Sequence, residues 1–378
     1  MKRGAVLAAT ALLVALSYFL QREAGRGTFD PVERAFVSWL SANAGGKPDL
    51  PPLTLVLYDE EASELAGSGR MAMLDGALFA RAASRLGAAG AGIVGLAGDP
   101  TRMIEAAGGM PVFGGFTFSV PPGSGWTPLR GEPGRGWEEA PGLAGRPGRF
   151  ARGFLVPPTG SSGPREILVA GRNGDRAVPS FLALAWAVAN GWRWSELTAQ
   201  PTSLDGPDAK LVLDGRGAAR FFPAGRAPVM TMNEVLVAAE AFEREGGTSA
   251  LRGHVMVLAP ATSDVTRVAG EGMVPVTPAE QWTQAWEAVR GNRMFLLPGW
   301  WYPLLTALAA AALALGPARR ANGAAVLAGL FTLMLFTLVA LGVFGSTRVV
   351  LPFLPASLTL VVALLLGRAG HSAGWLGK

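Results

Sequence analysis

The chain has 378 residues, a formal net charge of +5 and no cysteine, which excludes disulfides, a thiol nucleophile and thiolate metal ligands. The positive charge comes from the two ends of the chain, because residues 21–298 hold all 28 acidic residues but only 26 of the 33 basic ones. The total charge therefore reflects membrane topology and does not indicate nucleic-acid binding.

Four apolar segments predict a membrane protein. They lie at 5–20, 298–316, 323–344 and 349–367, and none contains Asp, Glu, Lys, Arg or His. A helix of about 20 residues crosses a hydrocarbon core, so we expect one anchor before a large domain and three transmembrane helices after it. The first segment is short and has a second interpretation, a signal peptide cleaved near Ala15-Leu16-Ser17.

Basic residues beside the four segments predict their orientation. They precede the first segment, separate the second from the third and follow the fourth, whereas only Arg348 lies between the third and fourth. The positive-inside rule then places both termini in the cytoplasm and residues 21–298 outside it. We expect a multi-pass protein of the bacterial inner membrane, with an anchor at 1–22, a periplasmic domain at 23–297, spans within 298–367 and a cytoplasmic tail at 368–378.

Apolar runs of strand length alternate with helical patterns in the first half of the outer domain. Strands are expected at 53–58, 92–97 and 111–118, with helices at 73–87 and 101–108 between them. Such alternation favours right-handed βαβ units. The predicted fold class is therefore α/β, with a mixed, mostly parallel sheet and flanking helices, joined to four transmembrane helices.

The second half of the domain begins with an irregular insertion at 119–165, in which 20 of the 47 residues are Gly or Pro. A hairpin is expected from 210–214 and 218–222 around Gly215-Arg216-Gly217. The remaining elements are predicted as strands at 166–170 and 254–259 and helices at 179–191, 231–244 and 278–291.

Four segments carry a resemblance to a known family. They are Leu57-Tyr58-Asp59-Glu60 after a strand, GAGIVGLA at 90–97, LRGHVMVLAPATSD at 251–264 and the helix ending at 284–294. In this order they resemble the type-2 CHASE domain, an extracellular sensory module associated with cyclases and histidine kinases. That family also has one leading helix and three trailing spans, which implies that the first helix is retained. The chain departs from the pattern at Ala97, where the family has an Asp, and at 69–73, which replaces a Trp-Pro-rich stretch.

Polar residues follow the predicted strands and form the candidate binding site. In open α/β sheets, ligands bind beyond the carboxyl ends of the strands. We therefore predict a small-ligand or cation site at that edge, and the alternative is that the same residues cap helices. The candidate residues are Asp59, Glu60, Asp99, Thr262 and Asp264, and Thr117 ends a neighbouring strand.

The sequence predicts no catalytic residues and no cofactor. His254 enters a strand and is expected to be structural, and with His371 as the only other histidine a His-rich metal site is excluded. We find no Walker-type phosphate loop and no nucleophile elbow. Three arginines of the outer domain, Arg172, Arg216 and Arg220, could hold an anionic ligand, and the favoured alternative is that they are simply solvated.

Two hypotheses of function follow. The first is an extracytoplasmic sensor or signal-relay protein that acts through a separate partner, because the expected cytoplasmic parts are too short to fold into a catalytic domain. The second is a non-catalytic structural or accessory subunit of a membrane protein complex. An enzyme ranks third and a transporter last, since the spans hold no ionisable residues. We expect partner proteins in the membrane to pack against residues 298–367.

Overall fold

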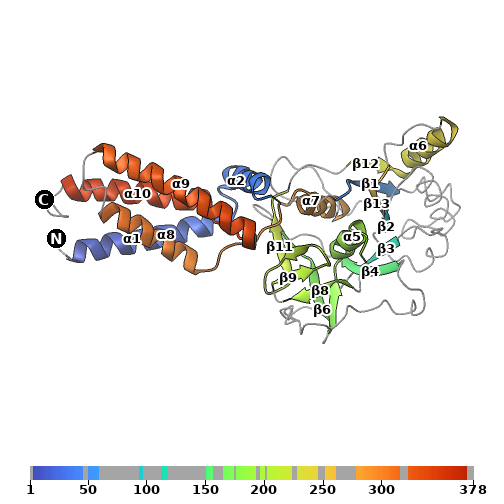
Figure 1. The fold of residues 1–378 in the computed structure, drawn as a ribbon, viewed down its shortest axis with the longest axis horizontal. Helices are drawn as coiled ribbons and strands as arrows, with labels where there is room; N and C mark the ends of the chain where they lie inside the picture. Colours follow the sequence, from blue (N-terminus) through green and yellow to red (C-terminus); the bar gives the residue numbers. More distant parts are fainter. Residues whose placement is uncertain are drawn as a thin grey trace. The chain divides into compact units, whose positions relative to one another are not determined.

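Figure 1 shows the computed structural model, which divides into a helical unit and an α/β unit. The helical unit is drawn from both ends of the chain, Met1–Gly46 and Phe295–Lys378, and the α/β unit from most of the residues between them. The structure describes residues 3–45, 50–58, 93–96, 112–117, 150–155, 165–173, 176–192, 196–200, 202–223, 228–245, 252–260, 278–315 and 322–372.

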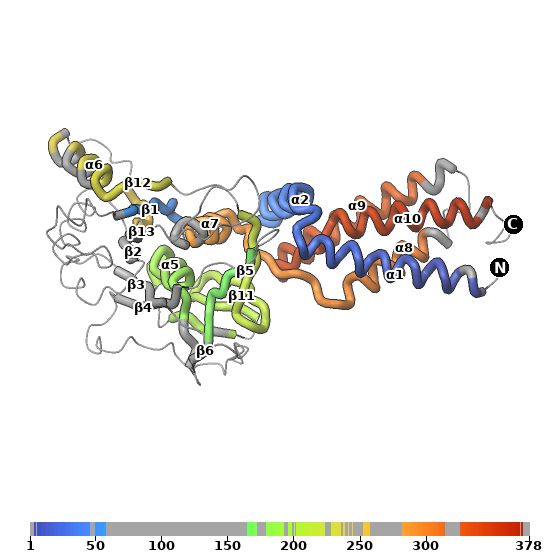
Figure 2. The backbone as a smooth tube through the Cα atoms, turned by 180° about the vertical axis from the view of Figure 1, so that it is seen from behind, coloured from blue at the N-terminus to red at the C-terminus, as the bar shows by residue number. Residues whose placement is uncertain are grey.

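Three helices of the helical unit are long and apolar enough to cross a membrane, over Val6–Gly25, Val326–Thr347 and Phe353–Gly370. Three of the four predicted segments thus have the required length and composition, which indicates a membrane protein. The helix at the second predicted segment is apolar over Trp301–Leu313 but shorter, so a fourth crossing stays a prediction. The helices of this unit, traced in Figure 2, are α1 (Arg3–Gly25), α2 (Asp30–Asn43), α8 (Trp301–Leu315), α9 (Asn322–Thr347) and α10 (Phe353–Ser372).

Helices α1, α8 and α10 pack against one another. Small side chains let helix backbones approach closely, and this contact is built mainly from alanines. The Tyr18 hydroxyl of α1 also donates a hydrogen bond to the Trp300 carbonyl oxygen, 2.8 Å away. The buried cluster consists of Leu13, Ala307, Ala310, Ala311 and Ala363.

A six-stranded sheet with the order β12-β1-β13-β2-β3-β4 lies in the α/β unit. Every neighbouring pair in it is parallel, and its continuous apolar strands are typical of a sheet covered on both faces. The four strands predicted from apolar runs are present to within one residue. The strands are β1 (Leu53–Tyr58), β2 (Ile93–Leu96), β3 (Val112–Thr117), β4 (Phe150–Leu155), β12 (Val229–Thr231) and β13 (Val255–Pro260).

The described helices of this unit pack on the sheet and form its core. Helix α5 (Phe181–Ala189) contacts β2, β3 and β4, and α7 (Pro278–Arg290) contacts β1 (Figure 1). Helix α5 is apolar on every side and buried over most of its length, as expected of a core helix. It begins at Ser180, whose side chain accepts the N–H of Ala183 at 3.2 Å. Helix α6 (Met232–Glu245) contacts β1 and the edge strand β12.

Two predictions for the second half of the domain are wrong. Strand β4 lies within the segment expected to be irregular and pairs in parallel with β3. The predicted hairpin is absent, because its two strands pair with other strands. Strand β10 (Lys210–Val212) pairs with β9 (Ser203–Asp205), and β11 (Ala218–Phe221) pairs with β5 (Arg165–Leu168). Its turn is present, since the Asp214 N–H donates to the Ala218 carbonyl at 2.7 Å, but each strand then takes a partner from elsewhere in the fold. The local turn signal thus predicted the turn correctly, but tertiary contacts decide which strands pair.

Short antiparallel strands complete the described part of this unit. They are β5 (Arg165–Leu168), β6 (Ala170–Asn173), β7 (Arg176–Pro179), β8 (Thr198–Gln200) and β9 (Ser203–Asp205). The three helices predicted in this half, α5, α6 and α7, are confirmed. The helices expected at 73–87 and 101–108 lie outside the described residues.

Candidate functional site

The edge of the sheet that was predicted to bind a ligand is defined by four parallel strands. Tyr58 at the end of β1 is paired with Pro260 at the end of β13, and Leu258 of β13 with Leu96 at the end of β2. These carboxyl ends therefore lie at one edge, as the prediction required. The residues proposed to act there, Asp59, Glu60, Asp99, Thr262 and Asp264, lie outside the described residues, and Thr117 is the last residue of β3.

His254 and two of the arginines of the outer domain have structural partners. The His254 Nδ1 lies 2.8 Å from the Thr54 hydroxyl, and burial, with the nearby positive charge of Arg290, lowers the pKa of this histidine. Arg216 and Arg220 pair with the carboxylate of Glu166, at 2.8 and 3.1 Å. His254 thus has a polar contact with β1, whereas Arg216 and Arg220 are held in ion pairs and are not merely solvated, as had been predicted.

Residues 348–354, which are the connection between α9 and α10 and the first two residues of α10, are here called the junction segment. Helix α9 ends at Thr347, and Arg348 follows with φ +58°, a left-handed conformation that is uncommon for a residue other than glycine. The Arg348 N–H still donates to the Phe344 carbonyl oxygen at 3.0 Å, which closes the last turn. The chain then turns through Pro352 into α10, so the junction is short and held by defined contacts.

Glu33 of α2 caps the beginning of α10. Its two carboxylate oxygens accept the backbone N–H groups of Phe353, at 3.2 Å, and Leu354, at 2.8 Å. The first N–H groups of a helix have no partner within the helix. The residue before α10 is Pro352, whose side chain cannot cap, and Pro355 has no N–H. A side chain more than 300 residues away in the sequence therefore takes the place of a local cap.

The Glu33 side chain is almost fully buried, with 6% of its surface exposed. Burial raises the pKa of this carboxyl, an effect that the hydrogen bonds from Leu354 and Phe353 oppose and the charge of Asp30 reinforces. The positive end of the α10 dipole faces it. Phe353 also contacts the ring of Phe36 on α2, with 4.9 Å between the ring centroids. Polar and aromatic contacts together fix α2 to the junction segment.

A second stretch of chain, which lies after the α/β unit in the sequence, also contacts the junction segment. Leu296, just after the α/β unit, forms a parallel bridge with Val349. Its N–H donates to the Arg348 carbonyl at 2.9 Å, and its own carbonyl accepts the Val350 N–H at 2.9 Å. The buried Tyr302 hydroxyl donates to the Pro352 carbonyl at 3.0 Å. Both chain connections to the α/β unit, after α2 and before α8, are thus adjacent to contacts with residues 348–354.

Within the α/β unit, the same two connections are again held together. The backbone carbonyls of Leu50 and Pro51, which lead into β1, each accept a hydrogen bond of 3.3 Å from α7. The donors are the Trp286 indole and the Arg290 guanidinium. Trp286 is fully buried. The segment that enters this unit and the helix that leaves it therefore form one packed structure.

Sequence reasoning missed α2 and Glu33. A signal was present, because Asp30 and Pro31 mark a helix start, and the buried positions that follow have amphipathic spacing: Glu33, Val37, Leu40 and Ser41. A carboxylate at one position of an otherwise apolar face is the feature that should have drawn notice. Its partner, the start of α10, is visible only in the folded chain.

Comparisons with models of known protein families, with curated proteins and with solved structures found no match to this chain.

Proposed function

We propose that this chain is a membrane-anchored extracytoplasmic sensor or signal-relay protein that acts through a separate partner. The observation that supports this proposal best is the junction segment. The chain enters the α/β unit after α2 and leaves it before Leu296, and both of these stretches contact residues 348–354. A change that alters how the α/β unit holds its two ends would therefore act on the connection between α9 and α10.

The relay would begin at the carboxyl edge of the parallel sheet. A ligand shifts a conformational equilibrium only if it binds one state more tightly than the other. Binding near the ends of β1 and β13 would favour one arrangement of β1, whose beginning is tied to Trp286 and Arg290 of α7. Helix α7 then leads to Leu296 within six residues of its end. The proposed signal thus has a continuous route of packed contacts within the α/β unit, followed by two covalent connections.

Helix α9 is the proposed output element. It makes few contacts with its neighbours in the described part of the helical unit, and large apolar side chains on it are exposed, among them Leu327, Leu330 and Phe331. Uncharged transmembrane helices associate through close packing. We propose that a membrane partner packs on this unit and responds when the junction segment moves.

The alternative is a non-catalytic structural or accessory subunit of a membrane complex. The observation that favours it is Ala97, which stands where the resembled sensory family has an aspartate. Loss of that carboxylate would weaken a ligand site at the same sheet edge. In this alternative the junction segment is a rigid support and carries no signal.

A disulfide across the junction distinguishes the two functions. Leu296 and Val349 are bridge partners, and the double variant Leu296→Cys with Val349→Cys replaces both. Because the chain has no cysteine of its own, these two thiols can pair only with each other within the chain. We expect the oxidised double variant to co-purify with the same membrane partners as the wild type. Expressed in a deletion strain, it should fail to restore the transcript profile that the wild type restores, and each single variant should restore it.

Equal restoration by the locked and the wild-type proteins would contradict the relay and favour the accessory subunit. Recovery of the wild type from native membranes as a monomer with nothing cross-linked to it would contradict both functions.

A further inference from the structure

Helix α2 exposes a face that carries no charged side chain. Its exposed residues recur every three or four positions and therefore form one stripe along the helix. The charged residues of α2, which are Asp30, Glu33 and Arg34, are buried or half-buried. A helix in water normally exposes its charged residues, so this face does not have the composition of a water-facing surface. The exposed residues are Pro31, Val32, Ala35, Ser38, Trp39, Ala42 and Asn43.

Helix α6 of the α/β unit gives the contrast. It has 14 residues, as α2 does, and its exposed positions include Glu234 and Arg244. Its exposed face thus has the charges that are typical of contact with water. The length of α2 does not explain why its own exposed face has none.

Helix α2 lies at the level where two membrane-spanning helices have an end. One of these helices ends at Gly25 and another begins at Phe353. Helix α2 begins at Asp30, shortly after Gly25, and its Glu33 carboxylate accepts the N–H groups of Phe353 and Leu354. Figure 2 shows α2 foreshortened where α1 and α10 are seen from the side, so α2 is turned across them. A helix that lies in the plane of a membrane surface has this direction.

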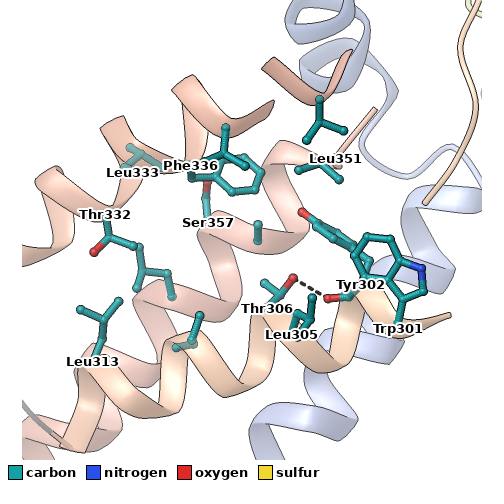
Figure 3. Close-up of a pocket in the computed structure, with 16 residues that line it drawn as sticks. Trp301, Tyr302, Leu305, Thr306, Leu313, Thr332, Leu333, Phe336, Leu351 and Ser357 are labelled. Carbon is teal, nitrogen blue, oxygen red and sulfur yellow. Dashed lines mark hydrogen bonds between the residues drawn. The ribbon is translucent and has the colours of Figure 1, made fainter. Parts of the chain in front are cut away.

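Aromatic residues at the start of α8 mark the same level. The Tyr302 hydroxyl donates to the carbonyl oxygen of Pro352, the residue before α10, at 3.0 Å, and Trp301 is exposed. An apolar groove lies between α8, α9 and α10. Figure 3 shows both rings at the end of this groove where Leu351 lies, with Leu313 at the other end. Because Trp and Tyr collect at membrane–water interfaces, the beginning of α10 lies at an interface.

A series of aromatic rings connects this groove to the exposed face of α2. Phe336 of α9 lines the groove, and its ring centroid lies 6.1 Å from that of Phe353. The Phe353 centroid lies 4.9 Å from that of Phe36, which in turn stacks on Trp39 at 6.0 Å. Trp39 is 41% exposed. The apolar surface of the spanning helices therefore continues onto α2.

We propose that α2 is an interfacial helix whose uncharged face, with Trp39 in it, lies among the lipids at the membrane surface. Its level, its missing surface charge and its continuity with the spanning helices together select a lipid surface as the occupant. Because the face holds no cation, a membrane of zwitterionic lipid suffices, and no anionic lipid is needed. This inference does not depend on the proposed relay or on which side of the membrane the α/β unit lies.

Quenching of single fluorescent labels in the full chain tests the proposal. The chain has no cysteine, so Ala35→Cys and Ala42→Cys, both on the exposed face of α2, can each take one nitrobenzoxadiazole label. The protein is reconstituted in phosphatidylcholine nanodiscs, which leave both membrane faces open to water. We expect nitroxide-labelled lipid to quench both labels, and depth analysis to place them about 5–10 Å into the boundary between headgroups and acyl chains. Ser38→Cys, on the same face, replaces either variant that does not elute as the wild type.

Two exposed positions elsewhere in the chain serve as matched controls. A label at Ala238→Cys on α6 should be quenched by iodide in the water severalfold more strongly than the α2 labels, and not by nitroxide lipid. A label at Leu335→Cys, near the middle of a spanning helix, should be quenched most by a nitroxide deep in the acyl chain.

Two results would overturn the proposal. Iodide quenching of the α2 labels as strong as that of Ala238→Cys would assign the face to water. Protection of the α2 labels from both iodide and nitroxide lipid would assign it to a protein surface, such as that of a second copy of the chain.

Discussion

Glu33 caps the beginning of α10, although it lies in a distant part of the sequence. A local cap would be an Asn, Asp, Ser or Thr just before α10, and the residues there are Leu351 and Pro352. The carboxylate of α2 supplies the missing acceptors and at the same time binds two helices together. Burial of Glu33 is unfavourable for its charge. The same residue both caps α10 and joins α2 to α10.

The first prediction concerns the acceptors of Glu33. Glu33→Ala leaves two part-buried N–H groups of α10 without their side-chain acceptor, and we expect a loss of about 1–3 kcal/mol in unfolding free energy. Glu33→Gln keeps one oxygen acceptor and should lose less. The control is Glu23→Ala, which removes an exposed ion pair with Arg26 and a hydrogen bond from the Thr28 hydroxyl and should cost under about 1 kcal/mol. Thermal unfolding in detergent measures all three, and equal losses for the two alanine variants would contradict the cap.

The second prediction concerns pH. The pKa of Glu33 is raised above its ordinary value of 4.5, so the folded protein takes up this proton before the unfolded chain does. The contribution of Glu33 to stability therefore rises as the pH falls through the folded pKa towards 4.5. The melting temperature of the wild type, relative to that of Glu33→Gln, should increase as the pH is lowered from neutral to 4.5. A constant difference between the two proteins across this range would show that the carboxyl does not titrate as proposed.

The third prediction tests the strand ends. If Asp59 belongs to a ligand site, Asp59→Asn should leave the stability of the ligand-free protein unchanged or raise it, because charge repulsion is relieved. The same variant should abolish the thermal stabilisation given by any ion or small molecule that stabilises the wild type. If Asp59 is a cap, Asp59→Ala should instead cost about 0.5–2 kcal/mol with no stabilising compound found.

At the scale of elements, the patterns that depend on local spacing were the ones that could be predicted. The continuous apolar runs of β1, β2, β3 and β13 indicated strands of a parallel sheet, and the structure pairs them in parallel. Strand β4 could not be found, because its sequence FARGFL lies in a Gly- and Pro-rich segment and its pairing with β3 is set by the fold. The hairpin failed for the same reason. Which strands pair is decided by the tertiary fold, whereas strand length and apolarity can be read from the local sequence.

The candidate site divides in a similar way. The position of the sheet edge followed from the parallel strands, but the junction segment depends on contacts between residues 50 to 321 positions apart. Helix α2 has an amphipathic pattern that predicts a helix, but nothing in its sequence predicts that α10 is the helix it contacts.

The fourth prediction tests how α2 is held. Leu40 is fully buried and Val32, on the same helix, is 41% exposed. Leu40→Ala should lower the unfolding free energy by about 2–5 kcal/mol, whereas Val32→Ala should change it by less than about 0.5 kcal/mol. If α2 contributes nothing to the helical unit, the two variants will unfold at the same temperature.

At the scale of the whole molecule, the α/β unit is inserted between α2 and the segment that begins at Phe295. Its two covalent connections are then continued by contacts to one short segment of the helical unit. The junction contacts themselves lie wholly within the helical unit. The arrangement suits a relay, and its orientation in the membrane decides which side is sensed.

The last prediction is this orientation. Paired arginines at 319–320, with a single arginine between the next two apolar helices, predict by the positive-inside rule that both termini are cytoplasmic and that the α/β unit is outside. Because the chain has no cysteine, single substitutions report location without background. Ser161→Cys should react with a membrane-impermeant thiol reagent in intact cells, and Ser372→Cys should react only after the cells are permeabilised. The reverse pattern would place the α/β unit in the cytoplasm and would remove the basis for an extracytoplasmic sensor, while leaving the Glu33 cap and the junction segment unchanged.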